Sequence, residues 1–97
     1  MKLTEEIANK VYNILEEIGA VPRMRDAFVR DHSSYSDQHE WRFQGKLGFG
    51  GKFWNEWSYL DDEPKWRVSC YSEDETPERE KIIEETNQKL RALAQTL

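Results

Sequence analysis

Two histidines and three carboxylates lie close together in the chain, and these residue types could ligate a metal ion. His32 and His39 are accompanied by Asp31, Asp37 and Glu40. A catalytic zinc site needs three protein ligands at fixed geometry. The five residues are irregularly spaced in a polar, serine-rich stretch, which favours a solvated loop. We therefore expect neither a bound metal nor a cofactor.

Glycines and the single cysteine are the next candidates for chemistry. The glycines at 45, 48, 50 and 51 suggest a phosphate-binding loop. Such loops lead into a helix, however, whereas these glycines lie in and beside an expected hairpin. Cys70 has no companion nucleophile, and its place on the inner face of an expected strand favours an inert core thiol. No serine stands in a nucleophile-elbow pattern, so the sequence predicts that the protein is not an enzyme.

Length and composition predict one soluble domain spanning residues 1–97. A chain of 97 residues supports one thin core, which four Trp, four Tyr and four Phe can organise. The lone cysteine excludes an internal disulfide and fits a reducing compartment. No signal-peptide pattern opens the chain, and no run approaches the ~20 apolar residues that span a bilayer. We expect a cytoplasmic protein without membrane contact.

The N-terminal part of the chain is expected to be helical. Apolar residues recur at helical spacing over residues 3–18, with Thr4 as the N-cap and Gly19 as the stop. A short extra helix near 22–30 would turn Phe28 inward. The polar stretch that follows is expected to be a loop.

The middle of the chain alternates with a period of two, which is typical of half-buried strands. Short connections between successive strands imply an antiparallel meander. The expected segments are a strand over 41–49, a tight turn at Gly50-Gly51, a strand over 53–59, a turn at 61–64 and a strand over 66–70.

The last helix has the clearest predicted boundary. Thr76 is a suitable N-cap, Pro77 suits the first helical position, and an apolar stripe continues to the end of the chain. The predicted fold class is therefore α+β, a three-stranded antiparallel β-meander flanked by an N-terminal and a C-terminal α-helix. Both helices are expected to cover the aromatic face of the sheet.

The acidic charge is concentrated in one part of the sequence. The chain carries a net charge of −5, and residues 61–80 alone carry eight acids and three bases, whereas residues 21–60 carry five acids and six bases. A patch of one sign attracts basic surfaces and repels phosphates. A solubilising surface with helix-capping acids is the alternative interpretation. The candidate partner-binding residues are Asp61, Asp62, Glu63, Glu73, Asp74, Glu75, Glu78 and Glu80, with Glu5, Glu6, Glu16 and Glu17 as an extension.

Two other binding modes stay open. Single-strand nucleic-acid binders combine stacking aromatics with a basic groove. The residues that could do this on the reverse face of the sheet are Arg42, Lys46, Lys52, Trp54 and Arg67. Because phosphate attraction supplies most non-specific affinity, the net charge of −5 argues against direct nucleic-acid binding. The third mode is a plain interaction module, either a monomer or a weak homodimer through an uncovered sheet face.

The whole chain resembles small proteins of phages, prophages and plasmids, in particular anti-CRISPR inhibitors of the type I-F surveillance complex. The resemblance lies in the segments WRFQGKLGFGGKFW (41–54) and WRVSCYSEDETPERE (66–80) and in length, acidity and the lack of a catalytic motif. It implies a phage-encoded DNA mimic, active in the cytoplasm of an infected bacterium, that blocks target DNA at Cas8-type and Cas7-type subunits. The class has no diagnostic motif, so it assigns no binding residue here. Under this resemblance the acidic cluster is the expected site.

Overall fold

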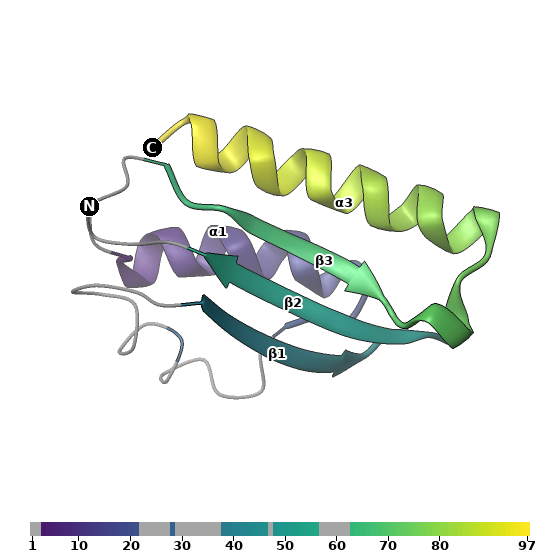
Figure 1. The fold of residues 1–97 in the computed structure, drawn as a ribbon. Coiled ribbons are helices and arrows are strands. Elements are labelled where there is room, and N and C mark those ends of the chain that lie inside the picture. Colours follow the sequence, from purple (N-terminus) through teal and green to yellow (C-terminus); the bar gives the residue numbers. More distant parts are fainter. Residues whose placement is uncertain (1–2, 22–27, 29–37, 47, 57–62) are drawn as a thin grey trace.

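A three-stranded antiparallel sheet and two long helices make up the described part of the chain (Figure 1). The computed structural model describes residues 3–21, 28, 38–46, 48–56 and 63–97. The strand order β1-β2-β3 is that of a meander, so the predicted α+β class is confirmed. The short helix expected near 22–30 lies outside the described residues, apart from Phe28. The elements are α1 (Glu5–Glu16), β1 (Gln38–Gln44), β2 (Gly50–Glu56), β3 (Trp66–Cys70), a 3₁₀ turn η1 (Ser72–Asp74) and α3 (Pro77–Gln95).

Both helices begin where the sequence predicts, because a local side chain caps each N-terminus. The Thr4 hydroxyl accepts a hydrogen bond from the Ile7 N–H at 3.2 Å, and Thr76 caps α3 in the same way at 3.2 Å. After α1 the Ala20 N–H reaches back to the carbonyl of Leu15 at 2.9 Å. This bond is typical of a glycine-terminated helix, and Gly19 has the required positive φ of 74°.

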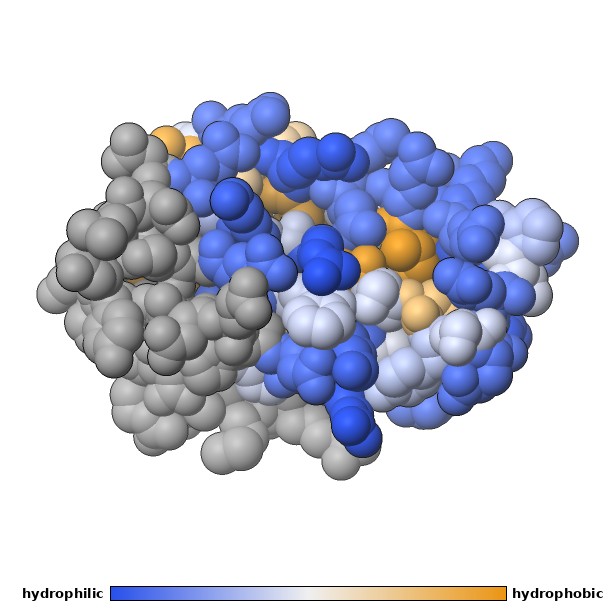
Figure 2. Space-filling view, in the orientation of Figure 1, coloured by the Kyte–Doolittle hydropathy of each residue, from blue (hydrophilic) through white to orange (hydrophobic). Residues whose placement is uncertain are grey.

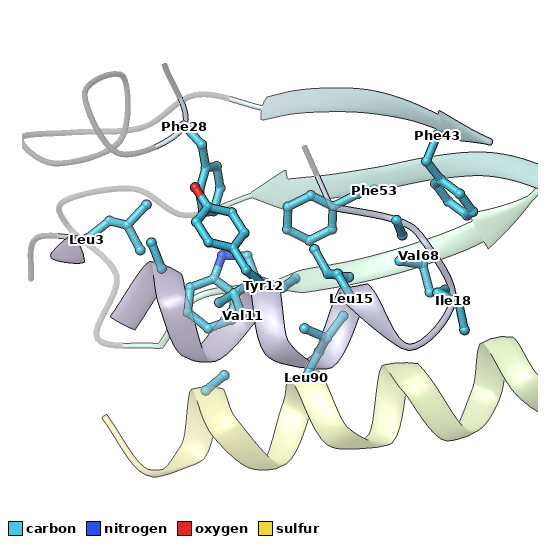
Figure 3. Packing of buried hydrophobic residues seen from close by; sticks show 14 of the residues in the cluster. Leu3, Val11, Tyr12, Leu15, Ile18, Phe28, Phe43, Phe53, Val68 and Leu90 are labelled. Atoms are coloured by element: carbon cyan, nitrogen blue, oxygen red, sulfur yellow. The ribbon is translucent and has the colours of Figure 1, made fainter. Parts of the chain in front are cut away.

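The core lies between α1, the inner face of the sheet and α3 (Figure 3). Leu15 of α1, Phe53 of β2 and Leu90 of α3 are all fully buried. Phe28 is also fully buried, and its ring lies 5.1 Å from that of Trp41 and 5.7 Å from that of Phe53. Its predicted inward position is therefore confirmed.

The predicted turn at Gly50-Gly51 is wrong. Gly50 pairs with Gln44 and Gly51 with Phe43, so both glycines belong to β2 and the chain turns over residues 45–49. A Cβ atom on Gly51 would overlap the carbonyl oxygen of Ser69 and lie 2.9 Å from the Phe43 ring. The glycine is thus needed for close strand packing, and the turn itself uses Gly48, whose φ is 81°.

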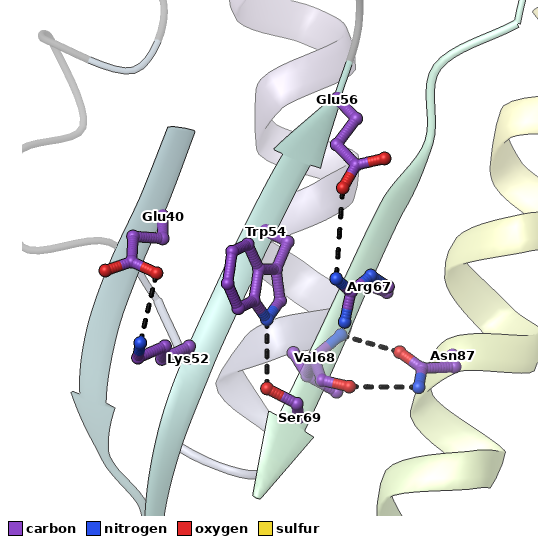
Figure 4. Close-up of polar contacts among 8 residues, drawn as sticks. All are labelled: Glu40, Lys52, Trp54, Glu56, Arg67, Val68, Ser69 and Asn87. Carbon is purple, nitrogen blue, oxygen red and sulfur yellow. Dashed lines mark hydrogen bonds and ion pairs between the residues drawn. The ribbon is translucent and has the colours of Figure 1, made fainter. Parts of the chain in front are cut away.

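One side chain of α3 closes the outer edge of β3. The Oδ1 atom of Asn87 accepts the Val68 N–H at 2.7 Å, and its Nδ2 donates to the Val68 carbonyl at 3.0 Å (Figure 4). In an antiparallel strand the N–H and the C=O of one residue point to the same side of the strand. The Asn87 amide therefore takes the place of a fourth strand at the centre of this edge.

Replacing Gly51 tests the close approach between β2 and β3. Gly51→Ala is expected to lower the free energy of unfolding by about 1–3 kcal/mol, as overpacking usually does. Gly48→Asn is the control, because a Cβ there meets nothing within 4 Å and asparagine tolerates positive φ. Urea denaturation measures both variants, and equal losses would contradict the packing role of Gly51.

Replacing Asn87 tests the closure of the β3 edge. Asn87→Leu leaves both peptide groups of Val68 without this partner and is expected to cost about 2 kcal/mol in unfolding free energy. Asn87→Asp keeps the acceptor and loses the donor, so its deficit relative to the wild type should shrink as falling pH protonates the introduced carboxyl. The exposed neighbour Gln88→Leu serves as the control. A pH-independent deficit for Asn87→Asp would contradict the proposed bonding.

Candidate functional site

Four exposed glutamates gather where the chain leaves β3 and enters α3. Glu73 belongs to η1, Glu75 follows it, and Glu78 and Glu80 lie in the first turn of α3. Acids at the start of a helix are favoured by its dipole. The four residues span only eight positions, and we call them the acidic end. They are the part of the predicted patch that the structure brings together.

Asp74 lies within this stretch but has a structural task. Its Oδ2 accepts the Gly50 N–H at 3.2 Å, and its Oδ1 lies 3.7 Å from Nη1 of Arg79. Arg79 also donates to the Asp74 carbonyl at 2.9 Å and packs over the Phe49 ring at 5.6 Å. These contacts join the β1–β2 turn to the start of α3. They also pair Arg79, the only basic residue of positions 71–80, with Asp74, and among the described residues none of the four glutamates forms an ion pair.

The remaining predicted acids do not join the acidic end. Glu63 is exposed at the opposite end of β3, roughly 16 Å away for a five-residue strand (Figure 1). Glu16 and Glu17, at the end of α1, lie 3.8 Å from Lys46 and 2.6 Å from Lys89 respectively. The other predicted members are Glu5 and Glu6, exposed in the first turn of α1, and Asp61 and Asp62, which lie outside the described residues.

The sheet face opposite α1 carries charges of both signs around Trp54 (Figure 4). The indole N–H donates to the Ser69 hydroxyl at 2.9 Å, and the Arg67 guanidinium lies 4.6 Å from the ring centroid. Lys52 is 5.3 Å from the same centroid and 3.1 Å from Glu40.

Of the predicted nucleic-acid-binding residues, this face gathers four and leaves one apart. The four are Arg42 and Arg67, which are exposed, and Lys52 and Trp54, which are half-buried. Arg67 also lies 3.8 Å from Glu56. Lys46 lies in the β1–β2 turn beside the end of α1, away from the face. Carboxylates thus accompany the cations, which weakens the attraction of this face for phosphates.

A groove that was not predicted runs between β3 and α3. It consists of two adjoining hollows of about 460 and 270 Å³, both lined by Asn87 and Arg91. Glu80 and Glu84 line the hollow near the acidic end, and Lys65 lines the other. Figure 2 shows hydrophobic surface exposed between the charged side chains along this line. The signal that could have revealed it is the 4-3-4 spacing of residues 80, 84, 87 and 91 on one helix face.

Cys70 also lines the groove, and it is half-buried rather than enclosed in the core. Burial raises the pKa of its thiol, and the nearby carboxylate of Asp74 raises the pKa further, while Arg79 opposes them. A raised pKa keeps the sulfur protonated at neutral pH, whereas a nucleophile requires the thiolate. The environment of Cys70 therefore suits a packing role.

The expected histidine-containing segment falls mostly outside the described residues. This applies to Asp31, His32 and Asp37, and the His39 side chain is likewise not described, whereas Glu40 pairs with Lys52. Where the structure describes the chain, it holds no cluster of three or more side chains suited to a metal ion. Within the same ranges, no helix combines the length and apolar character of a membrane span.

Comparisons with known proteins do not place the chain in a family. A scan against protein-family models found no match, and searches of curated proteins and of solved structures found no significant match either.

The raised pKa of Cys70 predicts slow alkylation. Its rate should rise with pH through a midpoint above the ~8.5 of a free cysteine. Glu75→Gln should accelerate the reaction at pH 8 by about twofold, since a single exposed charge screened by water contributes only ~0.5 kcal/mol. Glu78→Gln, which does not contribute to the shift, is the control. Mass spectrometry after iodoacetamide treatment measures the rates, and a midpoint below 8.5 would contradict this environment.

Proposed function

We propose that the protein is a non-enzymatic inhibitor that presents its acidic end to a basic, nucleic-acid-binding surface of a partner protein. The supporting observation is the placement of four exposed glutamates within eight residues, where the single basic residue, Arg79, lies beside Asp74. Such a cluster creates a local negative field that attracts Lys and Arg side chains and speeds encounter. The neutral thiol of Cys70 favours binding over nucleophilic catalysis as the role of this end.

The resemblance to anti-CRISPR proteins supplies the partner class in this proposal. Duplex DNA presents about one charge per 1.7 Å of its axis, so a DNA channel must be lined with basic residues. Clustered carboxylates can occupy such a channel in place of phosphates. The partner would then be the surveillance complex of a bacterial CRISPR system, and the protein would exclude target DNA without turnover.

The mixed-sign sheet face is consistent with this arrangement. Around Trp54 it carries Arg42, Lys52 and Arg67 beside Glu40 and Glu56. A molecule with an acidic end and a nearly balanced face is oriented by the field of a basic partner, because only one end is attracted strongly. The acidic end is therefore expected to make first contact.

Removing charge from the acidic end tests the proposal. Glu73→Gln with Glu78→Gln should weaken inhibition of target DNA binding by a type I-F surveillance complex by about fivefold, at ~0.5 kcal/mol for each exposed charge. The charge-conserving pair Glu73→Asp with Glu78→Asp is the control and should retain most of the inhibition. Electrophoretic mobility of labelled target duplex, titrated with inhibitor at two salt concentrations, measures the effect.

Two outcomes would contradict the proposal. Undiminished binding of target DNA at saturating protein would remove the inhibitor role for this complex. Direct binding of oligonucleotides by the protein at ~50 mM salt, where phosphate contacts are strong, would instead favour a nucleic-acid accessory function of the face around Trp54.

A further inference from the structure

The two hollows of the β3–α3 groove differ in the charges that line them. Three glutamates and Arg91 line the smaller hollow, whereas the larger one has charges of both signs: Glu56, Glu63, Lys65, Arg67 and Arg91. α3 runs antiparallel to β3 (Figure 1), so the stripe of Glu80, Glu84, Asn87 and Arg91 passes from acidic to basic along the groove. Glu75 adds a carboxylate at the acidic end. The groove therefore continues the negative field of the acidic end inward.

The lining between these charges is apolar. Val68, Cys70 and Ile83 line the smaller hollow, and hydrophobic surface is visible there in Figure 2. Ile83 is only half-buried, although it packs against the core. An apolar side chain seated here would remove this surface from water, at roughly 25 cal/mol per Å². The hollow of about 270 Å³ has room for one such side chain.

The backbone of β3 is not available at the centre of the groove. Asn87 already bonds both peptide groups of Val68, at 2.7 and 3.0 Å. An incoming chain thus cannot extend the sheet there by main-chain pairing, which is the usual mode of strand addition. Recognition must come from side chains.

We propose that the acidic half of this groove binds a short extended segment of the partner protein in which basic side chains flank one apolar side chain. The apolar side chain packs on Ile83 and Cys70, and the basic ones meet Glu80 and Glu84. On the strand side this half is lined by Val68, Ser69 and Cys70, a length of roughly 10 Å that matches about three extended residues. The inference rests on the proposed function, because the bound segment belongs to the same basic partner that the acidic end attracts.

Cys70 provides a direct readout of occupancy, since it is the single cysteine of the chain and lines this hollow. The probe is an end-capped peptide of sequence Arg-Lys-Leu-Lys-Arg, and the matched peptide carries Ser in place of Leu. At pH 8.5 the leucine peptide should slow alkylation of Cys70 at least fivefold at saturation. The serine peptide, of equal charge, should protect much less.

Paired variants locate the peptide. Glu80→Gln with Glu84→Gln should weaken peptide binding about tenfold, because both carboxylates line the groove. Glu5→Gln with Glu6→Gln makes the same charge change on α1, at residues that lie outside the acidic end and line neither hollow, and should weaken binding less than twofold. All four residues are exposed, so folding should be preserved.

The outcomes separate this inference from the proposed function. Equal protection by the two peptides, equal effects of the two variant pairs, or no protection at all would overturn the groove proposal. Inhibition of DNA binding by the surveillance complex could still persist in those cases, which would leave the acidic end as the site. Selective protection of Cys70 without any inhibition would support the groove and reject that particular partner.

Discussion

The amide of Asn87 is the contact on which the arrangement of the surface depends. It joins the middle of α3 to the outer edge of β3, replacing the hydrogen bonds that another strand would make. A bare edge would pair with other chains, and a helix packed by apolar contacts alone could slide along it. The two bonds to Val68 fix the helix in register with the strand. That register determines which carboxylates face the groove and which face solvent.

A second polar contact, between Asp74 and Arg79, uses two charged side chains to hold the fold together. Asp74 and Arg79 hold the β1–β2 turn against the start of α3, using a carboxylate and a guanidinium that would otherwise lie in the acidic end. The neighbouring glutamates Glu73 and Glu75 are left exposed. The local field of this end thus follows from which charges the fold uses internally, and the net charge of the chain does not reveal it.

The sequence was informative where structure is encoded locally. Thr4, Gly19 and Thr76 mark helix ends because each cap is made within a few residues. The predicted turn at Gly50-Gly51 was wrong because glycine occurs both in tight turns and where two strands approach closely. The neighbour that requires glycine at position 51 is Ser69, which lies on another strand. Likewise, nothing local distinguishes Asp74 from the glutamates beside it, since its partner Gly50 is 24 residues away. The groove arises only when β3 and α3 meet.

Charge and shape act over different distances at this end of the molecule. The screening length at physiological salt is ~8 Å, so the acidic end can bring a basic partner near but cannot select among basic partners. Selection among basic partners requires contacts that remove apolar surface from water. The apolar lining between Val68 and Ile83 offers such contacts in the same hollow as Glu80. Because Asn87 blocks main-chain pairing there, an arbitrary extended chain gains nothing from the strand edge. A partner must therefore supply both a basic and an apolar side chain at the right spacing, which general electrostatic attraction does not require.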